Sequence, residues 1–234
     1  MKISPETIVI LKNLAIFNAH LVVEPGNVIR TVNEKKTTLI KVTVPEEFPE
    51  EFAMHDLNGF LKILSLFEDP DFQFGENSVI ISDESGTNQE YYYSDKEELI
   101  WDNRNIDFPT TDIEVEVTAD ILKKVIKAAA INNAEDIAIV GEGGKVYLKA
   151  LDKTKANPEV NLTKTKRTFS VLLSDEDKGE FTVFLKHSKK GNKLSFLPLD
   201  YNVLISKKKI VNFTATIEDV EVSYIMAVEA DSEI

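Results

Sequence analysis

The sequence predicts an α+β protein made of two similar β-rich domains with two short helices each. Three observations lead to this fold class. Short runs of alternating apolar residues are frequent, whereas helical periodicity is confined to four short segments. Turn residues such as Pro25-Gly26 separate pairs of the alternating runs, as they do in hairpins. The order of the elements also repeats along the 234 residues, which indicates a tandem duplication.

Each half of the repeat begins with a capped helix. Ser4 followed by Pro5 has the residue types of an N-cap and a first helical position, and Thr118 occupies the corresponding place in the second half. A hairpin follows each helix, and then a strand that ends in a short helix, in "EEFAMHDLNGFL" and in "GEFTVFLKHSKK". The strands "NSVIIS" and "YNVLIS" come next. We therefore expect a first domain at 1–99, a connector at 100–113 and a second domain at 114–234.

Alternating apolar positions predict the strands of both domains. Two hairpins are expected, one turning at Pro25-Gly26 and one at the glycine-rich stretch 141–144. The stretch 99–112 follows neither the strand period nor the helix period, which is typical of a connector. The remaining strands are expected at Leu39–Val44, Ser78–Ser82, Thr168–Leu173, Leu194–Leu197, Val203–Ser206, Ile210–Thr216 and Glu221–Val228.

Four helical segments combine an apolar face with a basic face. They are Ile8–Ala19, Leu57–Phe67, Ile121–Ala134 and Leu185–Lys193, the last with a helix near Leu185–Lys190. These segments hold lysines but no acidic residue, although the chain carries 40 acidic against 27 basic residues and a formal net charge of −13. We predict that the lysines of the four segments line one shared surface. They are Lys12, Lys62, Lys123, Lys124, Lys127, Lys186, Lys189, Lys190 and Lys193.

A basic surface on so acidic a chain indicates contact with a polyanion. Lysines bind DNA phosphates by displacing counterions. The acidic remainder of the chain discourages nucleic acid from adhering elsewhere. Ordinary solvated helix faces are the alternative interpretation of the same residues.

The sequence lacks the motifs of an enzyme or a metal protein. Its three histidines have no partner at motif spacing. "GEGGK" lacks the spacing and the Ser/Thr of a phosphate loop, and "SDEDKGE" lacks the ligand spacing of a calcium loop. The absence of cysteine fits a reducing cytosol, and no apolar run approaches the ~20 residues of a membrane-spanning helix. We therefore expect no catalysis, no cofactor, no metal and no membrane association.

Three stretches give the chain a resemblance to a known family. They are "MKISPETIVILKNLAIFNA" at the start, "HDLNGFLKILSLF" at 55–67 and "YIMAVEAD" at 224–231. Together they resemble the DNA polymerase sliding clamp of T-even-type bacteriophages. The similarity runs collinearly over nearly the whole chain. It is most specific in "DLNGFL…ILSL", whereas the middle of the chain matches in pattern.

The resemblance implies the DNA-clamp fold and a closed ring of three copies joined head to tail. Strands would form the outside of the ring and helices the wall of a central hole, with the lysines facing duplex DNA. Such a clamp tethers the replicative DNA polymerase through the polymerase's C-terminal tail, after an ATP-driven clamp loader has placed the ring. Late-transcription factors would use similar tails. The implied location is the cytoplasm of the infected bacterial host.

The resemblance also places pockets for partner tails on the second domain near the connector. Trp101, Ile106, Phe108 and Met226 are our candidates for such a pocket. The chain departs from a strongly basic lumen, because its first half offers only Lys12 and Lys62. The alternative function is a non-ring acidic binding module, such as a DNA mimic or a virion protein with a duplicated domain.

Overall fold

The computed structural model describes residues 1–102, 104, 106–152, 168–187 and 193–234. These residues form two compact units. The first unit holds Met1–Ile106 with Thr216–Ser223, and the second holds Asp107–Ala215 with Tyr224–Ile234. The chain first passes from one unit to the other within the segment 100–113 and returns to the first unit for Thr216–Ser223. The limits of the sequence-based domains stay a prediction.

Helix α1 (Pro5–Phe17) opens the first unit. Ser4 Oγ accepts a hydrogen bond from Thr7 N at 3.2 Å, as expected for the N-cap. The Glu46 carboxylate accepts further hydrogen bonds from Ser4 N and, at 2.6 Å, from Thr7 Oγ1. Burial by itself would raise the pKa of Glu46, but these hydrogen bonds outweigh it and hold that pKa below its usual range. A charged side chain therefore fixes the start of α1.

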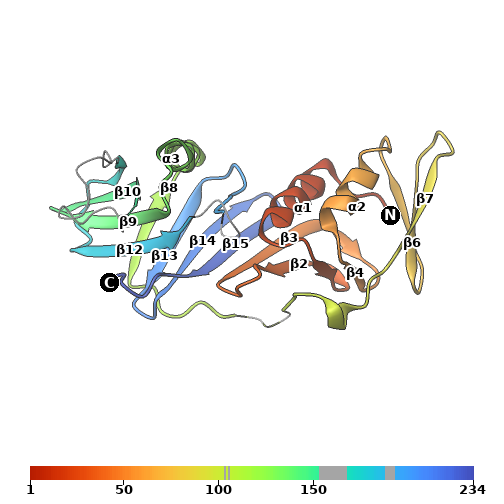
Figure 1. Ribbon diagram of the computed structural model, residues 1–234, viewed down its shortest axis with the longest axis horizontal. Helices are drawn as coiled ribbons and strands as arrows, with labels where there is room; N and C mark the ends of the chain where they lie inside the picture. The colour runs from red at the N-terminus through yellow and green to blue at the C-terminus, as the bar shows by residue number, and fades with distance from the viewer. Residues whose placement is uncertain (103, 105, 153–167, 188–192) are drawn as a thin grey trace. The chain divides into compact units, whose positions relative to one another are not determined.

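The strands of the first unit form two antiparallel groups. One runs in the order β4-β1-β2-β3 and the other in the order β5-β6-β7. Helix α2 (Leu57–Leu64) begins at Asp56, whose Oδ1 accepts a hydrogen bond from Gly59 N at 2.9 Å. Figure 1 shows α1 and α2 packed side by side. The other elements are β1 (Leu21–Val23), β2 (Gly26–Val32), β3 (Thr38–Phe48), β4 (Phe52–Met54), β5 (Asp71–Phe74), β6 (Ser78–Ser82), β7 (Asn88–Tyr92) and the 3₁₀ helix η1 (Lys96–Glu98).

The second unit contains helix α3 (Ala119–Asn132), which packs on strands β9, β10 and β11 through Leu122, Val125 and Ala129 (Figure 1). Its strands run in the orders β11-β10-β9-β12 and β15-β14-β13-β8, to which β14 and β15 contribute the residues outside Thr216–Ser223. The β9–β10 turn is Gly143-Gly144, with φ of 58° and 74°, as a two-residue hairpin requires. The strands are β8 (Ile113–Val117), β9 (Asp136–Glu142), β10 (Lys145–Leu151), β11 (Phe169–Ser174), β12 (Phe181–Lys186), β13 (Tyr201–Ser206), β14 (Ile210–Ile217) and β15 (Val220–Ala227).

An aromatic cluster holds the segment before β13 against the core of the second unit. Phe196, Tyr201 and Tyr224 pack with ring centroids 5.0–5.9 Å apart. Tyr201 OH donates to Leu197 O at 3.0 Å, and Leu197 N donates to Tyr224 OH at 3.2 Å. Burial raises the pKa of Tyr224 to about 12, so both hydroxyls stay protonated at neutral pH.

The two units share one strand order, which confirms the duplication that the sequence predicts. In the first unit β1 pairs with β2 and β4, and β2 pairs with β3. In the second unit β9 pairs with β10 and β12, and β10 pairs with β11. Both predicted hairpins are present. The Lys2–Asp71 bridge precedes α1 just as the pairing of β8 with β13 precedes α3.

Several sequence-based expectations are wrong in detail. Leu185 and Lys186 end strand β12 instead of beginning a helix, and 188–190 lie outside the described residues. Leu194–Leu197 forms no strand, because the tyrosine hydroxyls bind its backbone. Strands β5, β7 and β8 were missed: β5 has only four residues and β7 is polar, whereas β8 alternates clearly but begins at Ile113, inside the expected connector.

Candidate nucleic-acid interface

The lysine face of α3 follows from the way the helix packs. Thr118 Oγ1 caps the helix by accepting from Ile121 N at 3.4 Å. Leu122, Val125 and Ala129 are buried against the sheet. The 3.6-residue period then turns the positions between them outward. The exposed cations of this face are Lys123, Lys124 and Lys127, which we call the α3 lysine face.

None of the three ammonium groups of the α3 lysine face makes an ion pair within the described part of the chain. The one acid on the helix is Asp120 in the first turn, where it complements the helix dipole and, at three and four positions before Lys123 and Lys124, offsets part of their charge. Residues three and four apart lie next to each other on a helix surface, so Lys127 neighbours both Lys123 and Lys124. The face is therefore a compact patch of three like charges.

The helices of the first unit present a different surface. Lys12 on α1 and Lys62 on α2 are both exposed, as predicted, but each is the one cation of its helix. Lys12 lies between Val9 and Ile16, which are each 48% exposed. Leu66, just beyond α2, is 71% exposed. Apolar side chains thus occupy much of the surface that the first unit was expected to offer to phosphates.

The remaining predicted cations fall into three groups. Lys186 lies on β12, and its ammonium is 3.3 Å from both Glu135 Oε2 and Asp136 Oδ1, so its charge is already compensated. Lys193 is exposed. Lys189 and Lys190 lie outside the described residues. Sequence patterning could not anticipate the pairing of Lys186, because the helix expected there would have turned it away from the strand that carries Asp136.

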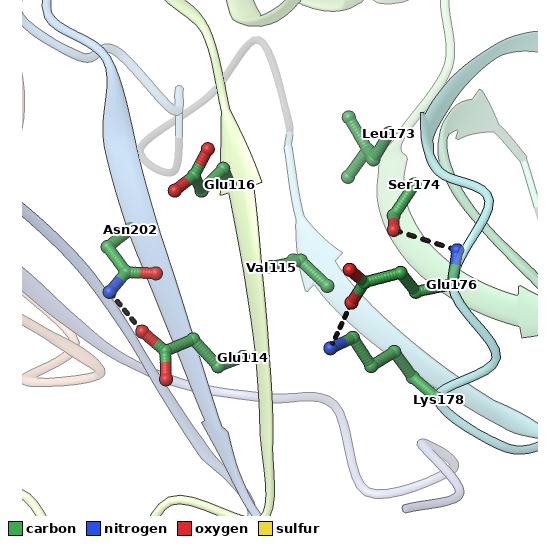
Figure 2. Close-up of a pocket in the computed structure, with 8 residues that line it drawn as sticks. All are labelled: Glu114, Val115, Glu116, Leu173, Ser174, Glu176, Lys178 and Asn202. Atoms are coloured by element: carbon green, nitrogen blue, oxygen red, sulfur yellow. Dashed lines mark hydrogen bonds and ion pairs between the residues drawn. The ribbon is translucent and has the colours of Figure 1, made fainter.

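An acidic groove of about 360 Å³ lies between β8 and the end of β11 in the second unit (Figure 2). Its carboxylates come from Glu114, Glu116 and Glu176, and Lys178 is paired with Glu176 at 2.8 Å. Asn202 donates a hydrogen bond to Glu114. Uncompensated carboxylates repel phosphates. We therefore exclude this groove from the nucleic-acid surface.

The four candidate pocket residues divide between the two units. Trp101 is partly buried against Val22, Ala53 and Leu99, and the Lys96 ammonium lies 5.6 Å from its ring centroid. Ile106 is 41% exposed, and Phe108 is partly buried. Met226 is only 2% exposed, so it packs in the core of the second unit.

The position of the open strand edges is a feature that sequence reasoning did not give. Among the described strands, β7 pairs with β6 alone, β11 with β10 alone and β8 with β13 alone. Two further edges are covered: residues 229–233 bind the edge of β12, with Thr182 N and Glu233 O 2.7 Å apart, and Ser94 N donates to Ala53 O of β4. Strand β7 is polar, whereas β11 is apolar and exposes 46% of Leu172.

The described residues include no group of three His, Asp or Glu side chains that could hold a metal. His20 and His55 have ring centroids 4.9 Å apart, but His20 Nδ1 accepts a hydrogen bond from Ile100 N at 2.9 Å. Burial and the neighbouring His55 lower the pKa of His20, which fits a neutral structural residue. No helix in the described ranges has the length and hydropathy to cross a membrane.

Solved structures identify the fold of the chain. The chain matches A. fulgidus PCNA, solved with the C-terminal region of FEN-1, with a TM-score of 0.68 and 14% identity, over 97% of this chain and 96% of that one. PCNA from Entamoeba histolytica gives a TM-score of 0.68 at 11% identity, over 95% and 94%. At such low identity these matches show the fold alone. That fold is the PCNA-like clamp fold.

Sequence comparisons identify the family. The model for the DNA polymerase processivity factor matches 4–100, and the model for the gp45 sliding clamp, C terminal, matches 114–230. Sliding clamps of Vibrio phage KVP40 and Escherichia phage RB69 are each 29% identical, over 98% and 99% of this chain and 100% and 98% of theirs. The sliding clamp of Enterobacteria phage T4 is 28% identical over 99% and 98%. The chain belongs to the phage sliding-clamp family of DNA polymerase processivity factors.

Proposed function

We propose that three copies of this chain close head to tail into a ring around duplex DNA. The observation that carries the proposal is an open strand edge in each unit, β7 in the first and β11 in the second. Joining β11 of one copy to β7 of the next satisfies both edges with backbone hydrogen bonds. The two surfaces differ, so the contact is heterologous and generates a ring when the rotation closes.

The charge distribution supports encirclement over adhesion. The chain carries a formal net charge of −13, so it cannot hold DNA by overall attraction. Lysines exposed on helices supply screened, interchangeable contacts to phosphates, which carry no sequence information. A protein of this charge stays on DNA because the ring is closed, and it slides because no single contact is strong.

The proposed partners follow from the family. We propose that the ring tethers DNA polymerase through an apolar C-terminal tail, that an ATP-driven clamp loader places it on DNA, and that late-transcription factors use it as a mobile platform. The role is non-catalytic, and the location is the cytoplasm of the infected bacterial host. Trp101, Ile106 and Phe108 remain candidates for contacting such tails, whereas Met226 is buried in the core of the second unit.

The experiment that tests the proposal compares DNA with and without ends. Labelled protein is loaded on nicked circular DNA by the ATP-driven loader, and the retained protein is measured before and after restriction cutting. We expect retention on circles, release after cutting, and renewed retention when bulky proteins block both ends. A non-ring binding module predicts equal retention in all three states, because local contacts do not sense the ends of DNA. Equal retention would therefore contradict the proposal.

A further inference from the structure

The contrast between the helix surfaces of the two units carries an inference about how the ring meets DNA. The α3 lysine face has three exposed lysines within little more than one turn. Helices α1 and α2 have one exposed lysine each. The number of exposed helical lysines therefore already favours the second unit as the site of phosphate contact. The surroundings of the lysines increase the difference.

In α3, the C-terminal border of the lysine face carries no acidic residue. Ala130 and Ile131 follow it, and Ile131 is 63% exposed. Asp120 in the first turn lies three and four positions before Lys123 and Lys124 and offsets part of their charge, whereas Lys127 has no acid at that spacing. Like charges at i, i+3 and i, i+4 repel one another. A bound phosphate offsets this repulsion, so the three lysines have a lower electrostatic energy when an anion is present.

In the first unit, the two lysines are isolated. Val9 and Ile16 flank Lys12 at helical spacing, and neither side chain can bind a phosphate. Lys62 lies among Asn58 and Ser65, which are exposed and uncharged. Each lysine therefore acts as a single exposed charge, whose interaction is weakened by water and salt.

We infer that the second unit makes the principal phosphate contacts of the ring through the α3 lysine face, and that α1 and α2 of the first unit contribute little. This inference rests on the proposed function, since it concerns the DNA inside the ring. A ring of three copies then offers three α3 lysine faces to the duplex. The duplex engages few phosphates at any moment, which favours sliding over gripping.

The test uses two double variants of the full chain with matched charge changes. Lys123→Ala with Lys127→Ala alters the second unit, and Lys12→Ala with Lys62→Ala alters the first. Both variants remove two exposed helical lysines per chain. Equilibrium binding to a short linear duplex of random sequence is measured at several salt concentrations. Light scattering confirms that each variant keeps the assembly state of the parent.

With one α3 lysine face engaged at a time, two phosphate contacts of ~0.9 each are lost, so we expect the magnitude of the slope of log K against log salt to fall by about 2 for the α3 variant. The first-unit variant should keep the parent's slope and an affinity within twofold. Equal slope changes in both variants, or none in either, would overturn the inference. The proposed function fails separately, if the parent protein is retained equally on circular and cut DNA. A slope change confined to the α3 variant would in that case still support α3 as the basic contact surface.

Discussion

The two units have the same strand order but different surfaces. In both units a capped helix covers the strands that follow it, and the strands pair in the same order. The helix face is basic on α3 and largely apolar on α1, and the open edge is apolar on β11 and polar on β7. The buried pattern is under packing constraints in both copies, whereas the exposed positions are free to change. Duplication has therefore kept the architecture and divided the surface roles.

The units also differ in how the first helix is anchored. Glu46 accepts hydrogen bonds from Ser4 N and Thr7 Oγ1 at the start of α1, in a partly buried place. At the start of α3, Asp200 accepts one from Ala119 N at 2.8 Å, but its carboxylate is exposed. A hydrogen bond to a charged group contributes more when water is excluded. We therefore expect the anchor of the first unit to be the stronger one.

The largest expected effect concerns the open edge of β11. Leu172→Asp places a charge and a poor strand former on an exposed edge residue, next to which β7 of another copy would pair. We expect the assembly to fall from about three times 26.3 kDa to 26.3 kDa in light scattering at micromolar concentration. Ile217→Asp, at a residue 52% exposed on β14, is the control and should leave the trimer intact. A trimer that survives Leu172→Asp would move the interface away from β11.

An intermediate effect should separate the two helix anchors. Glu46→Ala should lower the free energy of unfolding by about 1–2 kcal/mol, because it removes two hydrogen bonds to a charged, partly buried group. Asp200→Ala should cost less than half as much. Urea unfolding at neutral pH measures both values. A larger loss for Asp200→Ala would reverse the order of the two anchors.

The Glu46→Ala variant also gives a pH test. The pKa of Glu46 is lower in the folded protein than its ordinary value of 4.5, so its contribution to stability is complete above pH 4.5. That contribution disappears as the pH falls through the folded pKa. The difference between the parent and Glu46→Ala should therefore shrink on acidification below 4.5. A constant difference would show that the charge of Glu46 is not what stabilises α1.

The smallest expected effect is a slight gain in stability. Lys127→Gln removes the repulsion with Lys123 and Lys124 and should stabilise the fold by about 0.3 kcal/mol, since lysine and glutamine have similar helix propensities. Lys12→Gln is the control, because Lys12 has no charged residue three or four positions away on α1, and it should be neutral. Thermal unfolding at low salt resolves the two. Equal shifts would mean that the α3 lysines do not repel each other.

Much of the fold could be predicted because it depends on local pattern. Apolar positions at helical spacing, such as Leu57, Phe60 and Leu64, gave the position of α2, and glycines at 143–144 gave the β9–β10 turn. The exposure of Lys123, Lys124 and Lys127 followed from the same periodicity. The expected helix near Leu185 was wrong. Over only six residues, the apolar pattern of a strand and that of a short helix differ little.

The sequence by itself determined the duplicated order of elements, the caps at Ser4 and Thr118, and the basic face of α3, because each depends on residues a few positions apart. Only the tertiary structure decided which charges lack an ion pair and which strand edges are open. Lys186 is compensated because β12 pairs with β9, which brings its ammonium beside Asp136 fifty residues away. The edge of β12 is covered and that of β11 is open because the C-terminal segment folds back on one and not the other. These features depend on pairing between segments that are distant in the chain, and a local sequence pattern does not show which segments pair.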